Sequence, residues 1–175
     1  PTIFGDSPYQ PSSGCAGNIY FIDLDKLVDE GLLEKEEILE YNWGTDESEI
    51  DYAALHQNRC KILQKAFERF DTNAQEFHDF VKKQSEWLEQ NALFMTLKTD
   101  NLYKNWSEWS SEYRNPQTVA LEKYQKKNYN TITFWKFCQY KFFEQWEDLK
   151  NYANSKGVYI IGDISFYVGY DSVDV

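Results

Sequence analysis

The stretch KGVYIIGDI, residues 156–164, decides the expected fold. Its centre, Val158–Ile161, is short, apolar and rich in β-branched side chains, and Gly157 and Gly162 bound it on both sides. This pattern predicts a strand that is buried on both faces, as in a parallel sheet. Such a strand needs parallel neighbours, and no convincing second strand precedes it. We therefore expect the chain to be a piece of a larger α/β protein.

The sequence before this strand has a helical period almost throughout residues 51–153. Apolar stripes predict helices over residues 52–70, 77–95 and 135–153, and a shorter helix within 19–33. The chain is therefore expected to be mostly helical. The expected helix boundaries are an N-cap at Asp23 or Asp25, a stop at Gly31, a capping box of Thr72 and Gln75, a start at Asn115 and Pro116, and a stop at Gly157.

Composition and charge limit the kinds of partner. The chain has 175 residues, enough for one domain with a sizeable core, and a formal net charge of −11 at pH 7. An acidic chain repels polyphosphates, so we expect neither nucleic-acid binding nor docking on anionic membranes. Aromatic residues make up 18% of the chain, which favours a packed state over disorder. No apolar run approaches the length of a membrane span.

Cysteine and histidine usage argues against a metal site. The three cysteines, Cys15, Cys60 and Cys138, are widely spaced and form no Cys-x-x-Cys pair, which is typical of free thiols in a reducing compartment such as the cytoplasm. His56 and His78 lie on predicted helices without a metal-ligating partner four residues on. No glycine-rich phosphate loop is present, and we expect no metal and no cofactor.

The loop GDSPYQ, residues 5–10, is the first candidate site. A turn that presents Asp, Ser, Tyr and Gln offers hydroxyl and amide groups beside an aromatic ring. Sugars require that combination, because their hydroxyls need polar partners and the apolar face of a pyranose packs on a ring. The alternative is that Asp6 and Ser7 only bond to the backbone of their own turn.

Asp163 is the second candidate, because it follows directly on the predicted buried strand. In α/β folds, ligand-binding groups lie past the carboxyl ends of the strands. The alternative is that the Asp163 carboxylate accepts hydrogen bonds from nearby backbone N–H groups. Asp171 and Asp174 are more simply explained as the cap and first-turn acid of a helix N-terminus.

Three segments together resemble the 4-alpha-glucanotransferases, also called amylomaltases or disproportionating enzymes, of the alpha-amylase superfamily. They are GDSPYQ…AGN near the start, FCQYKFFEQWEDLKNYANSKGVYIIGDI over residues 137–164, and the closing YVGYDSVDV. The resemblance implies a partial (β/α)8 barrel with a large helical insertion. It further implies that residues 1–33 hold a barrel loop and first helix, residues 34–129 the insertion, and residues 130–175 a barrel helix, a buried strand and the following loop.

The resemblance also implies an activity. Members of the family move α-1,4-glucan segments between maltooligosaccharides by a retaining double displacement, in which a carboxylate forms a glycosyl-enzyme intermediate. The catalytic carboxylates of the family come from later strands, so no residue of this chain is expected to be catalytic. Ser7, Tyr9 and Asp163 match family positions that contact the glucan.

Two other functions stay open at this point. One is a non-catalytic, acidic helical module that binds glucan or a protein. The other is a hydrolase of the same superfamily, which would pass the glycosyl group to water instead of a sugar.

Overall fold

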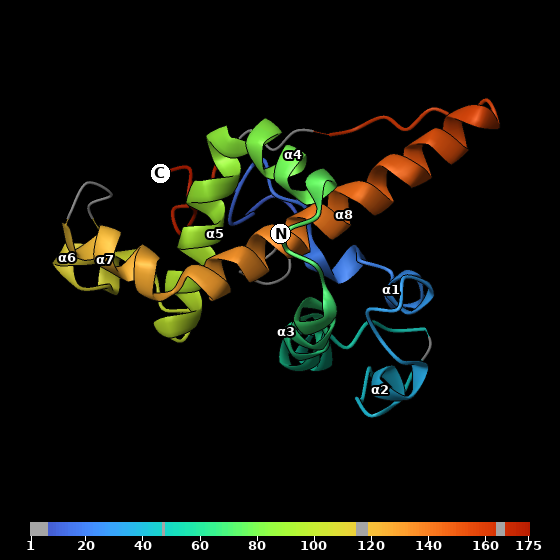
Figure 1. Ribbon diagram of the computed structural model, residues 1–175, viewed down its shortest axis with the longest axis horizontal. Coiled ribbons are helices and arrows are strands. Elements are labelled where there is room, and N and C mark those ends of the chain that lie inside the picture. Colours follow the sequence, from blue (N-terminus) through green and yellow to red (C-terminus); the bar gives the residue numbers. More distant parts are fainter. Residues whose placement is uncertain (1–6, 47, 115–118, 164–166) are drawn as a thin grey trace.

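The computed structural model describes residues 7–46, 48–114, 119–163 and 167–175, and the predicted helix start at Asn115 and Pro116 lies outside them. The described residues form helices and connecting loops without a strand, so the expectation of a mostly helical chain is confirmed (Figure 1). None of their helices is long and apolar enough to cross a membrane. The helices are η1 Ile19–Phe21, α1 Leu24–Asp29, α2 Lys35–Leu39, α3 Tyr52–Arg69, α4 Gln75–Lys83, α5 Ser85–Asp100, η2 Trp106–Glu108, α6 Ser111–Arg114, α7 Val119–Lys127 and α8 Tyr129–Ser155.

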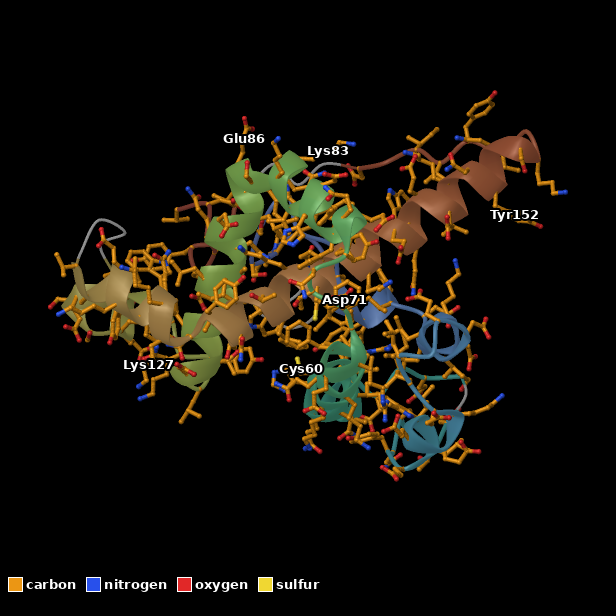
Figure 2. The ribbon with its side chains drawn as sticks, in the orientation of Figure 1. Cys60, Asp71, Lys83, Glu86, Lys127 and Tyr152 are labelled. Carbon is orange, nitrogen blue, oxygen red and sulfur yellow. The ribbon has the colours of Figure 1, made fainter. Side chains whose placement is uncertain are left out.

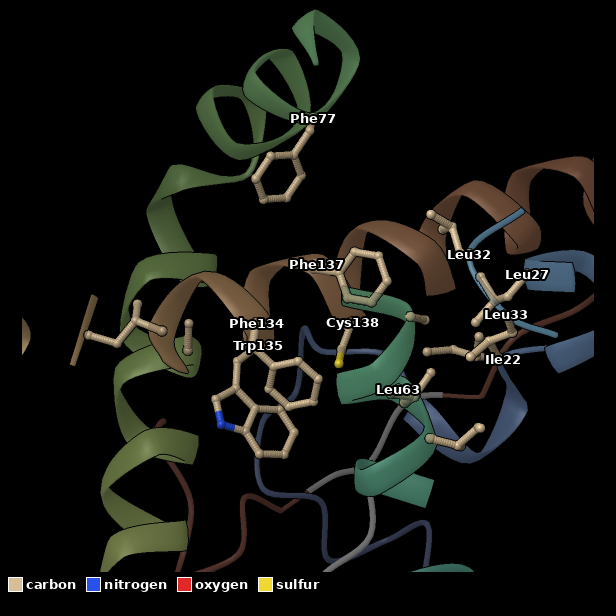
Figure 3. Packing of buried hydrophobic residues seen from close by; sticks show 14 residues of the cluster. Ile22, Leu27, Leu32, Leu33, Leu63, Phe77, Phe134, Trp135, Phe137 and Cys138 are labelled. Carbon is tan, nitrogen blue, oxygen red and sulfur yellow. The ribbon is translucent and has the colours of Figure 1, made fainter. Parts of the chain in front are cut away.

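The long helix α8 is the axis of the molecule, and α3, α4 and α5 pack against it (Figure 1). Its first two thirds carry buried apolar side chains that meet those of the other helices in one core (Figure 3). The predicted stripe over residues 135–153 is only partly buried, because Leu149 and Tyr152 near its end are exposed. Beyond Gln145 the helix has no buried residue and projects away from the core. The buried residues of the core are Ile22, Leu27, Leu32, Leu33, Ile62, Leu63, Ala66, Phe77, Ala92, Ile132, Phe134, Trp135, Phe137 and Cys138.

Two of the predicted helix stops are confirmed. Gly157 has φ +75° and follows the last residues of α8, where the Val158 N–H donates to the Ala153 carbonyl at 3.0 Å. This Schellman arrangement needs a residue in the left-handed region, which glycine adopts without a steric cost. Gly31, with φ +73°, ends α1 in the same way, and Asp23 caps its start by accepting from the Asp25 N–H.

The predicted capping box of Thr72 and Gln75 is wrong. The residue before α4 is Ala74, and no side chain caps the helix there. Instead the Asp71 carboxylate accepts the Asn73 N–H at 2.9 Å, so residues 71–74 form a turn before the helix begins at Gln75. The stripe over residues 77–95 also belongs to two helices, because the chain turns at Gln84 between α4 and α5.

The predicted strand Val158–Ile161 is also wrong for this chain. Residues 158–163 have no regular secondary structure, and Ile161 is 94% exposed. The physical reason is that a buried parallel strand exists only between neighbours, and the described residues contain no strand to pair with it. Of the second apolar piece, Phe166 lies outside the described residues, and Tyr167 and Val168 are exposed.

A surface ion pair between α2 and α3 gives a pH-dependent prediction. The Arg69 guanidinium donates to both Glu37 carboxylate oxygens, at 2.6 and 2.9 Å, and with the Glu34 N–H it lowers the Glu37 pKa from 4.5 to about 2. A folded-state pKa below the unfolded value adds stability that is present above pH 4.5 and is lost as the pH falls towards 2.

We therefore expect Arg69→Met to lower the melting temperature at pH 7, and we expect this difference to shrink below about pH 4.5. Thermal melts of both proteins between pH 2 and pH 7 measure it. If the gap between the two melting temperatures stayed constant down to pH 2, the ion pair would not be its cause.

Candidate functional site

The N-terminal candidate loop forms a tight turn at its described residues. The Gln10 N–H donates to the Ser7 carbonyl at 3.2 Å, and the Tyr9 N–H donates to the Ser7 hydroxyl at 3.3 Å. Ser7 thus bonds to its own turn, as the alternative interpretation expected. Gly5 and Asp6 lie outside the described residues. The turn leaves Tyr9 62% exposed, so its ring is free to contact a ligand.

Tyr9 and Asp163 lie together, although 154 residues separate them in the sequence. The Tyr9 hydroxyl donates to Asp163 Oδ2 at 3.4 Å, and both side chains are exposed. An aromatic ring, a hydroxyl and a carboxylate therefore share one surface. Such a surface can hydrogen-bond the hydroxyls of a polar ligand and pack against an apolar face.

The N-terminal loop is anchored on α8. The Gly17 N–H donates to Gln139 Oε1 at 2.7 Å, and Gln139 Nε2 donates back to the Gly17 carbonyl at 3.1 Å. Both Gln139 and this end of the loop are buried, so the paired amide bonds replace bonds to water. A Cβ atom at Gly17 would lie 1.9 Å from a ring carbon of Phe142. Only glycine therefore allows the loop to approach the helix this closely.

The C-terminal segment is hydrogen-bonded to the same loop. The Val173 N–H donates to the Ser12 carbonyl at 2.9 Å, and the Gly14 N–H donates to Asp174 Oδ2 at 2.6 Å. The loop that carries Tyr9 is therefore bonded both to Asp163 and to residues 173 and 174 near the end of the chain.

The prediction that Asp171 and Asp174 begin a helix is wrong, because residues 171–175 form turns. Asp171 is instead buried, and its Oδ2 accepts from Lys98 Nζ at 2.5 Å. Lys98 was not among the residues predicted from the sequence. Its position four residues after the buried Phe94, on the inner face of α5, was the available signal, but its partner lies 73 residues away.

Two of the three thiols, those of Cys60 and Cys138, are poor candidates for reactive groups. Burial raises the pKa of Cys60 to about 11 and that of Cys138 well above its usual range, so both stay protonated near neutral pH. The three cysteines are free, as expected. His56 packs against the Tyr103 ring, and within the described ranges no three His, Cys, Asp or Glu residues are placed to hold a metal ion.

A helical scaffold with an exposed hydroxyl, ring and carboxylate is of the kind that contacts carbohydrates. Comparison with known proteins gives the family: the model described as 4-alpha-glucanotransferase matches residues 1–175, and the chain belongs to that family. It is 41% identical, over 99% of its length, to the 4-alpha-glucanotransferases of Clostridium butyricum and Streptococcus pneumoniae. Among solved structures, an amylomaltase from Streptococcus agalactiae in complex with acarbose matches with a TM-score of 0.90 and 37% identity over 99% of this chain.

The chain spans only part of these relatives. It covers 36% of the Clostridium butyricum protein, 35% of the Streptococcus pneumoniae protein and 36% of the Streptococcus agalactiae chain. About two thirds of each relative therefore has no counterpart in this sequence.

Proposed function

We propose that the chain is part of an enzyme that transfers α-1,4-glucan segments between maltooligosaccharides by a retaining double displacement. Family membership over the whole chain supports this, as does the likeness to an amylomaltase that binds acarbose. The observation that carries the proposal is the meeting of Tyr9 and Asp163, from opposite ends of the chain, on one exposed surface. Ser7, Tyr9 and Asp163 contact the glucan, with the Tyr9 ring against a sugar face.

No residue of this chain is assigned a catalytic role. Retaining transfer requires two carboxylates on either side of the scissile bond, one as nucleophile and one as acid and base. We propose that these carboxylates lie in the part of the enzyme that has no counterpart here. Asp163 hydrogen-bonds the sugar that is passed to the nucleophile.

The proposal also includes the partial (β/α)8 barrel. Residues 1–33 and 130–175 belong to the barrel in this proposal, and residues 34–129 form the helical insertion. The exposure of Val158–Ile161 and of Tyr152, on the projecting end of α8 (Figure 2), supports this, because later strands and helices of a barrel would cover both. Three free cysteines support a cytoplasmic location.

Incubating the complete protein with maltotriose tests the proposed reaction. Transfer gives maltooligosaccharides longer than maltotriose, together with glucose or maltose. Glucose and maltose without longer products would identify a hydrolase. Binding of maltotriose with no product at all would favour the alternative of a non-catalytic, acidic helical module that binds glucan or a protein.

Tyr9→Ala tests the sugar contact. We expect it to lower kcat/KM on maltotriose about thirtyfold in the complete protein, because ring and hydroxyl contacts each contribute ~1 kcal/mol. Tyr9→Phe keeps the ring and loses the bond to Asp163, so a smaller decrease is expected. Tyr129→Ala, at an equally exposed tyrosine at the start of α8, is the control. Equal kinetics for Tyr9→Ala and Tyr129→Ala would contradict the role of Tyr9.

A further inference from the structure

Lys98, near the end of α5, is a fully buried cation with a complete set of partners. Its Nζ donates to Asp171 Oδ2 at 2.5 Å, to the Lys104 carbonyl at 2.8 Å and to the Tyr103 carbonyl at 3.3 Å. An ammonium group has three donors, so all of them are used. The second oxygen of Asp171 accepts the Trp106 N–H at 3.1 Å.

The turn that receives Lys98 is held in an unfavourable backbone conformation. Leu102 and Tyr103 have φ values of +54° and +58°, in the left-handed region, where a residue with a side chain costs ~1 kcal/mol. Such a conformation persists only where the surroundings hold it. The bonds from Lys98 to two carbonyls of the turn do so, and the turn then directs the Trp106 N–H towards Asp171.

Asp171 connects this arrangement to the candidate site. Two and three residues further on, Val173 bonds to Ser12 and Asp174 bonds to Gly14, in the loop that carries Tyr9. Eight residues before it in the same segment lies Asp163. Val173 also packs against an apolar cluster, defined by Phe94, Leu97, Trp109 and Leu121, that α5 shares with its neighbours.

Stability alone does not explain a buried ion pair. Removing two charges from water costs several kcal/mol, and replacing such a pair by apolar residues of similar size is often neutral or stabilising. A hydrogen-bonded ion pair, by contrast, has a defined geometry, so it holds the segment that carries Asp171 in one position relative to α5. The distinction matters here because that segment bonds, through Val173 and Asp174, to the loop that carries Tyr9.

We propose that Lys98 is a positioning residue: through Asp171 it fixes residues 171–174, and these hold the loop that carries Tyr9 in the orientation that binds glucan. The inference rests on the proposed function and deepens it. Lys98, a residue of the proposed helical insertion, would then affect the affinity for glucan without contacting the sugar.

The test is the double variant Lys98→Met/Asp171→Leu in the complete protein, with acarbose as the probe. Both charges are removed together, so neither is left buried and unpaired. We expect the Kd for acarbose, measured by calorimetry, and the KM for maltotriose to rise about tenfold, which corresponds to ~1.4 kcal/mol. We expect a smaller loss of stability than for Lys98→Met alone, because no buried charge is left unpaired.

A matched control is Lys141→Met/Glu30→Leu. Lys141 is also a buried lysine, and its Nζ donates to Glu30 at 2.6 Å and to Glu144 at 2.7 Å, but the Glu30 pair joins α8 to the end of α1 instead of the C-terminal segment. Its double variant also removes one buried lysine and one of its carboxylate partners, and it is expected to leave the Kd for acarbose unchanged. A merely structural role for Lys98 would give the two double variants the same binding.

A second variant keeps the inference testable if the double variant does not fold. Asp174→Ala removes an exposed carboxylate that accepts a hydrogen bond from the Gly14 N–H in the loop that carries Tyr9. Because this carboxylate is exposed, the fold is expected to survive its removal. It should raise the Kd for acarbose severalfold without lowering the melting temperature. Wild-type affinity in Asp174→Ala, or in a folded Lys98→Met/Asp171→Leu, would overturn the inference and leave the proposed function standing. Failure of the unmodified protein to bind acarbose and to transfer glucan would overturn both.

Discussion

Asp163→Asn is expected to lower kcat/KM for maltotriose transfer by between about tenfold and a hundredfold in the complete protein. A hydrogen bond to a charged group contributes ~1.5–3 kcal/mol, and each 1.4 kcal/mol is a factor of ten in rate. The substitution keeps the size of the side chain and removes the negative charge. Asp163 is exposed, so the melting temperature should stay close to that of the wild type. Initial rates and thermal melts of the two proteins measure both effects.

Asp148→Asn is the control for this prediction. Asp148 is an exposed carboxylate on the projecting part of α8 and pairs with Lys26 at 3.3 Å, far along the chain from the Tyr9 loop. It should change neither rate nor melting temperature appreciably. In the alternative interpretation, the Asp163 carboxylate only accepts hydrogen bonds from backbone N–H groups. That interpretation predicts the reverse pattern for Asp163→Asn, a lower melting temperature with unchanged kinetics.

Lys98→Met alone is expected to lower the free energy of unfolding by ~3–5 kcal/mol. The substitution leaves the Asp171 carboxylate buried without its cation, and it removes a donor from the carbonyls of Tyr103 and Lys104. A loss of that size is a large part of the stability of most domains. Urea denaturation of the complete protein, followed by circular dichroism, measures it.

Lys150→Met provides the comparison. Lys150 pairs with Glu147 at 2.6 Å on the exposed side of α8, where a pair of this spacing contributes ~0.5 kcal/mol or less. Lys98→Met is therefore expected to lower the free energy of unfolding several times more than Lys150→Met. Similar losses for both variants would mean that the environment of Lys98 is as well solvated as that of Lys150.

Local pattern was enough to predict most of the helices. The stripes that became α3 and α8 are long, and the glycines that end α1 and α8 act through their own φ angles, so both signals are contained within a few turns. The break between α4 and α5 at Gln84 was not predicted. An apolar stripe indicates which side chains are buried, but it does not show whether they belong to one helix or to two.

The remaining differences come from contacts between distant residues. Val158–Ile161 has the composition of a buried strand, but a strand depends on partners that its own residues cannot provide. Asp171 was interpreted from its neighbours in the sequence, whereas its environment is set by Lys98 on α5. The proximity of Tyr9 and Asp163 could be expected only from the family resemblance, because no spacing rule relates residues so far apart.

The exposed segment Val158–Ile161, which follows α8, has a consequence for the synthesis of the protein in the cell. If the enzyme is made as one long polypeptide, as proposed, this run leaves the ribosome well before the segments that would shield it. At ~5–20 residues per second, covering it takes many seconds, during which it can associate with the same run of another nascent chain. Chaperones that bind short hydrophobic segments would then have a target at residues 158–161, and their depletion should reduce the yield of soluble enzyme.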